Sequence, residues 1–187
     1  MRHKYATRAI VLARHPAGEA NATLTLLTRE LGVVRARAQG VRRSGAKLAA
    51  ALATFSESDV VLVRGAEGWR LSGAVLAEHW FAKVGSADAR ALASRFVGLL
   101  LRLAPVDAAE PALFPLMEEL LGALASAPPE SYDAIECLAA LRLLAALGFD
   151  AGALPAGGFS PNALTEVAGD RRAFIARVNH GIEASGL

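Results

Sequence analysis

Residues 32–40 read Gly-Val-Val-Arg-Ala-Arg-Ala-Gln-Gly, and they give the strongest local indication of the fold. Apolar and polar side chains alternate along this segment, which is the period of a β-strand with one buried face. The polar face carries Arg35, Arg37 and Gln39, and the apolar face carries Val34, Ala36 and Ala38. A glycine at each end marks a turn. The sequence therefore predicts a short strand with a basic outer face and a core-facing inner one.

Four more strands are indicated on the two sides of this one. Runs rich in Val, Ile, Leu and Thr, bounded by Gly, Pro or polar residues, occupy 8–14, 23–28, 59–64 and 69–75. The four residues 65–68, Gly-Ala-Glu-Gly, have the length of a hairpin turn. If the second strand pairs with the third, Thr23 and Thr25 lie beside the arginines. Five short strands, with a long connection between the third and the fourth, predict a small barrel or sandwich.

The hydrophobic period becomes helical after about residue 78. Helices are predicted over 87–103, from Pro111 or Pro115 to residue 125, over 131–147 and over 173–182, with a Gly- and Pro-rich loop over 150–161. The helix over 131–147 is nearly all apolar in its second half, which is typical of a buried central helix. Strands followed by helices predict an α+β protein with two domains in sequence. These are a β domain over 1–78 and an α-helical domain over 79–187.

Charge is divided unevenly along the 187 residues. Residues 1–48 hold ten Lys and Arg and two acidic residues, a net charge of +8, whereas 49–187 hold ten and sixteen, a net charge of −6. A basic end of this kind points to a polyanion, with nucleic acid as the first candidate. The alternative is that these cations only solvate an exposed sheet. Barrels of the OB type present their second and third strands to single-stranded nucleic acid, and Arg35 and Arg37 fall on the third.

The segment from Gly40 to Leu48 partly matches a phosphate-binding loop. Ala46 separates Gly45 from Lys47, and Leu48 stands where Ser or Thr would reach a magnesium ion. The segment is therefore not that of a nucleoside triphosphatase. A loop of Gly and Ser with three cations can still hold the backbone phosphates of a nucleic acid. The three cations are Arg42, Arg43 and Lys47.

Aromatic residues are scarce in the basic segment, where Tyr5 is the one example. Phe55 and Trp69 fall in apolar strand patterns and are expected in the core rather than on a base-stacking surface. Nucleic-acid binding is therefore expected to run through the backbone, to fall steeply with salt and to select sequence weakly.

The sequence contains no recognisable catalytic or cofactor-binding constellation. Its four histidines lie far apart, and its single cysteine excludes an intramolecular disulfide and a four-cysteine zinc site. Ser160 lacks the G-x-S-x-G pattern and a following helix. No apolar run approaches the roughly 20 residues of a membrane span, and the N-terminus lacks the apolar stretch of a signal peptide. A cytoplasmic, non-enzymatic protein without metal or cofactor is predicted.

Several short motifs together match one family. Residues 9–19 (AIVLARHPAGE), 27–32 (LTRELG), 39–44 (QGVRRS) and 52–55 (LATF), with 64–65 (RG) and 69–71 (WRL), occur in a fixed order and spacing. In that order they resemble the N-terminal domain of RecO, the bacterial recombination mediator family. The likeness is looser through the helices and resumes at 147–149 (LGF) and 158–161 (GFSP).

The resemblance implies an N-terminal OB fold, a C-terminal helical domain and a non-enzymatic role in recombinational DNA repair. RecO-like proteins bind single- and double-stranded DNA and promote annealing of complementary strands. They associate with RecR and with the acidic C-terminal tail of single-stranded-DNA-binding protein, and they help to load RecA. Carried over by motif, the DNA contacts are Arg14, Arg35, Arg37, Arg42, Arg43 and Lys47. The candidate partner contacts are Arg90, Arg95 and Arg102, with Lys83, Arg171 and Arg172 as further candidates for the acidic tail.

Two departures from the family pattern change these expectations. Many members have a four-cysteine zinc knuckle just after the position of Phe149, where this chain has no cysteine, so a zinc-less form is expected. The chain is also shorter than most members, so a reduced helical domain is expected. Two other functions stay open: a scaffold that binds proteins through its helices and has little DNA affinity, and an OB-fold module that binds RNA. The predicted localisation is cytoplasmic and nucleoid-associated, with no membrane partner.

Overall fold

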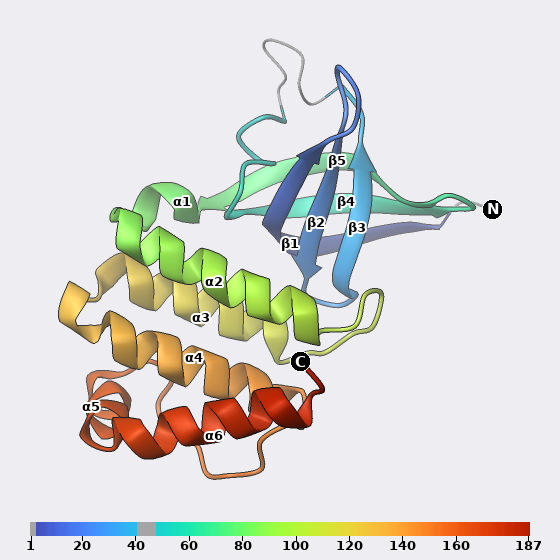
Figure 1. The fold of residues 1–187 in the computed structure, drawn as a ribbon. Helices are drawn as coiled ribbons and strands as arrows, with labels where there is room; N and C mark the ends of the chain where they lie inside the picture. Colours follow the sequence, from blue (N-terminus) through green and yellow to red (C-terminus); the bar gives the residue numbers. More distant parts are fainter. Residues whose placement is uncertain (1–2, 41–47) are drawn as a thin grey trace. The chain divides into compact units, whose positions relative to one another are not determined.

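The computed structural model describes residues 3–40 and 48–187, and the N-terminal part of the chain is a closed β-barrel (Figure 1). Its strands are β1 (Lys4–Pro16), β2 (Ala22–Thr28), β3 (Gly32–Ala38), β4 (Ser56–Gly65) and β5 (Gly68–His79). They are hydrogen-bonded in the order β1-β2-β3-β5-β4, and β4 also pairs with β1. A closed five-stranded barrel followed by helices confirms the predicted α+β class and the OB-type barrel.

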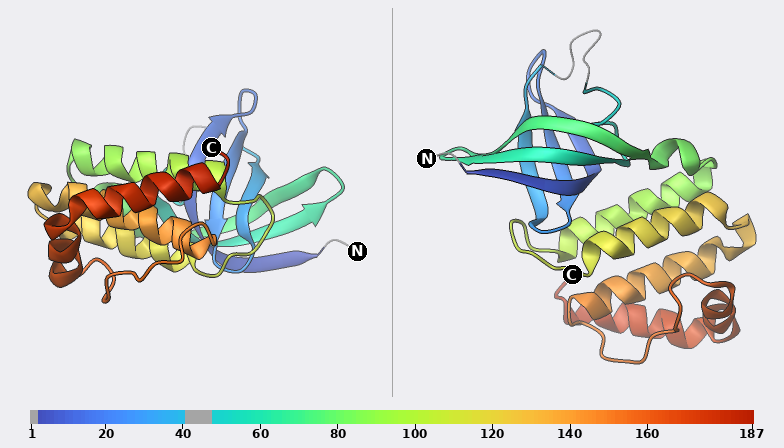
Figure 2. Two further views of the ribbon diagram at one scale, coloured as in Figure 1. Left: turned by 60° about the horizontal axis from the view of Figure 1, so that its bottom comes forward. Right: turned by 180° about the vertical axis from the view of Figure 1, so that it is seen from behind.

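Strands β1, β4 and β5 are longer than their apolar runs predict (Figure 2). Strand β1 pairs with a different neighbour along each half. The first half of β1 pairs with β4 from Lys4 to Ile10, and the second half pairs with β2 up to Pro16. A register shift between Val11 and Ala13 lies where β1 passes from one partner to the other. The extra residues of β1 include Lys4, Thr7 and His15, because strand pairing uses backbone groups and does not require an apolar side chain.

The barrel interior is filled by the inner faces of the strands. The core includes Val34, Ala36 and Ala38 of β3 together with Leu24, Leu26, Leu52, Val60 and Leu62. Arg35, Arg37 and Gln39 are exposed, so the alternation predicted for this segment is confirmed. Phe55 is 2% exposed, and its prediction as a core residue is confirmed.

The barrel closes between β3 and β5 over a short parallel contact. Only Ala36 with Trp69 and Arg37 with Arg70 are paired there. The start of β3 instead pairs with a segment from beyond the barrel, where Val33 bridges Val106 and the Asp107 amide donates to the Val33 carbonyl (2.8 Å). The residues 105–109 are named the β3 strap below. The strap completes the edge that β5 leaves open.

Helices make up most of the rest of the chain: α1 (Trp80–Lys83), α2 (Ala87–Leu103), α3 (Leu113–Ser126), a 3-10 turn η1 (Pro129–Ser131), α4 (Tyr132–Ala146), α5 (Pro161–Gly169) and α6 (Arg171–Ala184). Helix α4 packs against α2, α5 and α6. Its buried residues include Ile135, Leu138, Leu141, Leu143 and Leu144. These positions lie on more than one side of the helix, which confirms the prediction of a buried central helix.

Helix α5 is not predicted by the sequence, and the statement that no helix follows Ser160 is wrong. The Ser160 hydroxyl accepts a hydrogen bond from the Ala163 amide (3.4 Å), and Pro161 occupies the first turn. Serine at the N-cap followed by proline is a favourable helix start. The helix has only nine residues and buries only Ala163 and Val167, so its hydrophobic period is too short to recognise.

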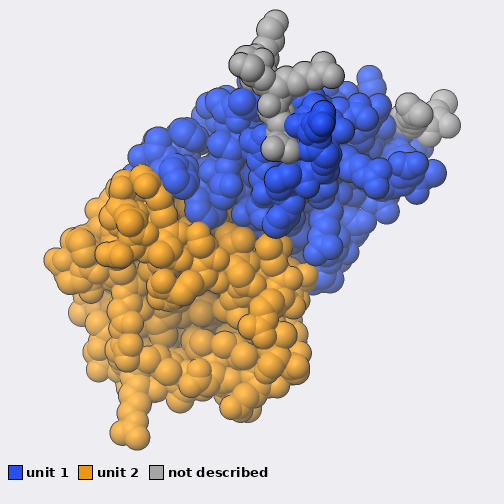
Figure 3. Space-filling model, turned by 45° about the horizontal axis from the view of Figure 1, so that its top comes forward, with its two compact units in different colours: residues 1–83, 105–114 blue, residues 84–104, 115–187 orange. Residues whose placement is uncertain are grey.

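Two compact units divide the chain (Figure 3). Unit 1 comprises residues 1–83 and 105–114, and unit 2 comprises 84–104 and 115–187. The prediction of a single domain boundary after residue 78 stays a prediction. Residues 105–114 belong to the same compact unit as the barrel, because the β3 strap pairs with β3. No helix within residues 3–40 and 48–187 has the length and apolarity that crossing a bilayer requires.

Candidate nucleic-acid interface

The outer face of β2 and β3 brings two predicted arginines together. In the antiparallel register, Thr23 lies opposite Arg37 and Thr25 lies opposite Arg35, as the sequence predicts. Paired residues project to the same side of a sheet, so these four side chains share the outer face. Arg35 is exposed and has no hydrogen-bond or ion-pair partner among the described residues. Within the described residues, Arg35 can therefore bind an anion without first breaking an internal contact.

Arg37 has one weak internal partner. Its guanidinium lies 3.1 Å from the Glu67 carboxylate in the β4–β5 turn, and the two side chains are 68% and 86% exposed. An exposed ion pair of this kind contributes little stability, because water screens both charges. A phosphate can thus replace Glu67 at small cost.

A third arginine enters this surface through the closure of the barrel. The parallel pairing places Arg70 of β5 beside Arg37 of β3, and Arg70 is exposed with no partner in the part of the chain that the structure describes. Arg35, Arg37 and Arg70 are named the basic barrel face below. The sequence analysis missed Arg70 as a site residue, because the pairing of two strands 30 residues apart leaves no pattern in either of them.

The remaining predicted DNA contacts do not join this surface within the described residues. Arg14 of β1 is paired with Leu24, which in turn is paired with Ala36. Leu24 and Ala36 face the core, so Arg14 belongs to their row and not to that of Arg35 or Arg37. Arg42, Arg43 and Lys47 lie outside the described residues, and their role stays a prediction.

Trp69, which was expected in the core, is only half-buried. It packs against the barrel core, and its Nε1 donates to Asp107 Oδ1 (3.0 Å) in the β3 strap. The Arg64 guanidinium lies 4.9 Å from the centre of the Trp69 ring and donates to Asp107 Oδ2 (2.8 Å). Trp69 is paired with core-facing Ala36 and with Arg64, so these two side chains lie on the opposite side of the sheet from Arg37 and Arg70.

The arginines predicted to bind partners differ in their surroundings within unit 2. Arg90 donates to the carbonyls of Val84 and Gly85, and Arg95 pairs with both carboxylate oxygens of Glu136, which raises the pKa of Arg95. Arg171 pairs with Asp133, and this contact lowers the pKa of Asp133. Arg102 and Arg172 are exposed and have no partner in residues 3–40 and 48–187. Among the three named arginines of α2, Arg102 is thus the one left available to a partner.

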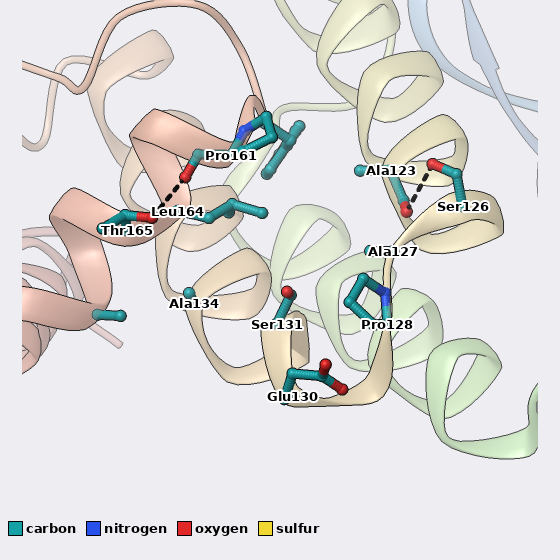
Figure 4. Close-up of a pocket in the computed structure, with 12 residues that line it drawn as sticks. Ala123, Ser126, Ala127, Pro128, Glu130, Ser131, Ala134, Pro161, Leu164 and Thr165 are labelled. Carbon is teal, nitrogen blue, oxygen red and sulfur yellow. Dashed lines mark hydrogen bonds between the residues drawn. The ribbon is translucent and has the colours of Figure 1, made fainter.

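A cavity of about 480 Å³ lies in unit 2, and no arginine lines it (Figure 4). Its walls come from the end of α3, the start of α4 and helix α5; they include Ala127, Pro128, Ala134, Phe159 and Leu164. The lining is mostly apolar and its one acidic residue is Glu130. Across the described ranges, no three His, Cys, Asp or Glu side chains are grouped in a way that would hold a metal ion.

The closed barrel with an exposed row of arginines defines the class of this protein as an OB-fold protein with a basic outer face. Residues 1–79 match the family described as Recombination protein O N terminal. Residues 1–79 are therefore an N-terminal domain of the RecO family.

Two relatives illustrate the extent of the likeness. The DNA repair protein RecO of Dehalococcoides mccartyi is 32% identical over 115 residues, which is 62% of this chain and 46% of the relative. The DNA repair protein RecO of Heliobacterium modesticaldum is 36% identical over 145 residues, or 78% of this chain and 52% of the relative. The chain therefore spans about half the length of the curated relatives it matches.

Proposed function

We propose that this chain binds DNA and acts in DNA repair and recombination. The observation that carries the proposal is the basic barrel face, where Arg35 and Arg70 are exposed without a described partner and Arg37 has only a weak one. Such cations are suited to a polyanionic ligand that supplies the counter-charge. The name of the relatives, DNA repair protein RecO, supports the role in repair.

The proposed action is non-enzymatic. Arginine contacts to the phosphates of single- and double-stranded DNA leave the base edges free, which would allow a bound strand to anneal with its complement. We further propose that the chain helps RecR to load RecA onto strands covered by single-stranded-DNA-binding protein, in the cytoplasm and at the nucleoid. The exposed Arg102 of unit 2 is the candidate contact for the acidic tail of that protein.

The salt dependence of binding tests whether phosphates are the ligand. About four phosphate contacts predict a slope near −3 for log affinity against log salt on single strands, or about a sixtyfold loss between roughly 50 and 200 mM salt. Fluorescence anisotropy of a labelled oligonucleotide measures this slope. Arg70→Ala is expected to make the slope shallower by about 0.7, because one contact is lost. No binding at the lower salt concentration would rule out the proposal.

Glu67 is expected to weaken DNA binding in the natural protein. Glu67→Gln should tighten binding to a single-stranded oligonucleotide about two- to fivefold, because it removes both the competitor for Arg37 and a charge that repels phosphate. The matched control is Glu183→Gln on α6, which removes an exposed carboxylate from unit 2. An equal gain in both variants would show that only net charge matters.

A further inference from the structure

One row of paired residues crosses all five strands on the outer face of the barrel. Successive pairs in the register lead from the second half of β1 over β2, β3, β5 and β4 to the first half of β1. Paired residues project to the same side of a sheet, and Arg37 and Arg70 are exposed, so the whole row lies outside. The members of this cross-strand row are, in order, His15, Thr23, Arg37, Arg70, Val63 and Lys4.

Lys4 adds a cation to one end of the row, on the far side of the barrel closure from β2. Its side chain is exposed and, like that of Arg70, has no hydrogen-bond or ion-pair partner among the described residues. Val63 lies between the two in the row and is uncharged, so Lys4 and Arg70 are two strand spacings apart, about 10 Å. At the other end, the exposed His15 has a ring N–H that can donate to a phosphate oxygen.

The outer face loses its positive charge four residues further along β1 and β4. Arg8 is paired with Asp59 there, and its guanidinium donates to the carboxylates of Asp59 (2.7 Å) and Glu57 (3.0 Å). Two carboxylates meet one guanidinium, and the Asp59 side chain is 60% exposed. A polyanion that ran along β4 would therefore approach a negative surface, whereas one that crossed the strands on the row would not.

We propose that a DNA strand crosses the barrel along the cross-strand row and that Lys4 is a phosphate contact at one end of this path. This inference rests on the proposed DNA binding and gives the bound strand a direction and a length. The path continues past β2 and β3, the strands that the sequence predicts as the interface, over β5 and β4 to the first half of β1. Because the strands of a barrel are tilted, such a row runs obliquely over one side of the barrel and does not encircle it.

The length of the path follows from the spacing of the strands. Five spacings of about 4.8 Å give about 24 Å. At a rise of about 3.4 Å per nucleotide, this length corresponds to about seven nucleotides of a stacked strand. A thymidine 12-mer is therefore long enough to reach every cation of the row.

Removal of the Lys4 charge tests whether the path reaches the first half of β1. Lys4→Gln is expected to weaken binding of the thymidine 12-mer about fivefold at about 0.1 M salt and to make the slope of log affinity against log salt shallower by about 0.7. The matched control is Arg172→Gln, which removes an exposed cation without a described partner from unit 2 and should leave the slope unchanged. Urea denaturation should give the same midpoint for both variants, because both side chains are exposed.

An added cation tests the path in the opposite direction, which loss of structure could not imitate. Thr23→Lys places a charge in the row between Arg37 and His15 and is expected to tighten binding of the 12-mer about three- to fivefold. Val75→Lys adds the same charge to an exposed position of the outer face, but beside Asp59 and off the row, so its affinity should stay within about twofold of the natural protein.

Two results would overturn the proposed path and leave DNA binding standing. The first is a salt slope for Lys4→Gln equal to that of Arg172→Gln, and the second is a gain from Val75→Lys as large as that from Thr23→Lys. If the natural protein did not bind the 12-mer at about 50 mM salt, the proposed DNA binding itself would fail.

Discussion

The double variant Arg35→Glu with Arg37→Glu is expected to bind DNA on the order of a hundredfold more weakly than the natural protein at about 0.1 M salt. Each substitution replaces an attraction to phosphate with a repulsion of similar size, and each such term is worth about 1 kcal/mol at contact distance in water. Both side chains are exposed, so unfolding free energy should change by less than about 0.5 kcal/mol per site. Anisotropy titration and urea denaturation measure the two quantities.

A control of equal charge separates a local surface from a general charge effect. Arg102→Glu with Arg172→Glu reverses two exposed arginines of unit 2 that have no partner in the described part of the chain. This control should lose far less affinity, because its charges lie off the barrel face. If both double variants lost affinity equally, the basic barrel face would not be the binding surface. If the Arg35→Glu with Arg37→Glu variant lost no DNA affinity, the result would favour the alternative function, a scaffold that binds proteins and has little DNA affinity.

Gly32→Ala is expected to destabilise unit 1 by about 2–4 kcal/mol. Gly32 has a φ of +68°, and a Cβ at this position would lie 1.9 Å from the Ala108 carbonyl oxygen of the β3 strap. The contact is with backbone on both sides, so it can be relieved only by moving the strap away from β3. That movement would break the hydrogen bond from the Asp107 amide to Val33. Urea denaturation followed by tryptophan emission measures the loss.

A second glycine with a positive φ serves as a control, because it separates the cost of the clash with Ala108 from the cost of the left-handed conformation. Gly18 has a φ of +81°, and a Cβ there would meet no atom within 4 Å. Gly18→Ala should therefore show only the cost of the left-handed conformation, about 1 kcal/mol. If Gly32→Ala lowered the free energy of unfolding no more than Gly18→Ala, the strap would be able to move away from β3 at no cost, and it would not stabilise the barrel.

Most of the barrel is predictable from local sequence, and so is part of the site. The alternation over Val34–Ala38 places Arg35 and Arg37 outside and the apolar residues inside, as the structure has them. The bounds of α2, 87–103, agree with the predicted helix, since its apolar stripe spans the whole element. Helix α5 escapes prediction because it is short and buries few residues.

The other site residues depend on contacts between segments far apart in the chain. The sequence predicts Arg70 only as an exposed strand residue. Its position beside Arg37 depends on the pairing of β5 with β3. The sequence predicts Trp69 as a core residue. In the structure, its side chain contacts Tyr5, Arg64 and Asp107, which come from three different segments. The strap that supplies Asp107 lies about 70 residues from the strand it completes. The hydrophobic period of a strand or a helix, two or 3.6 residues, gives no information on pairing between segments so far apart.

The sequence by itself determined the five strands and the longer helices, which face of β3 is basic and that the N-terminal segment is the positive end of the chain. These properties follow from the order of neighbouring side chains, because burial of one face repeats with the period of the element. Only the tertiary structure decided that Arg70 joins Arg35 and Arg37, that Arg14 does not, and that Tyr5 lies against Trp69. Those facts depend on strand register and on barrel closure, which fix distances between residues that the chain itself keeps far apart.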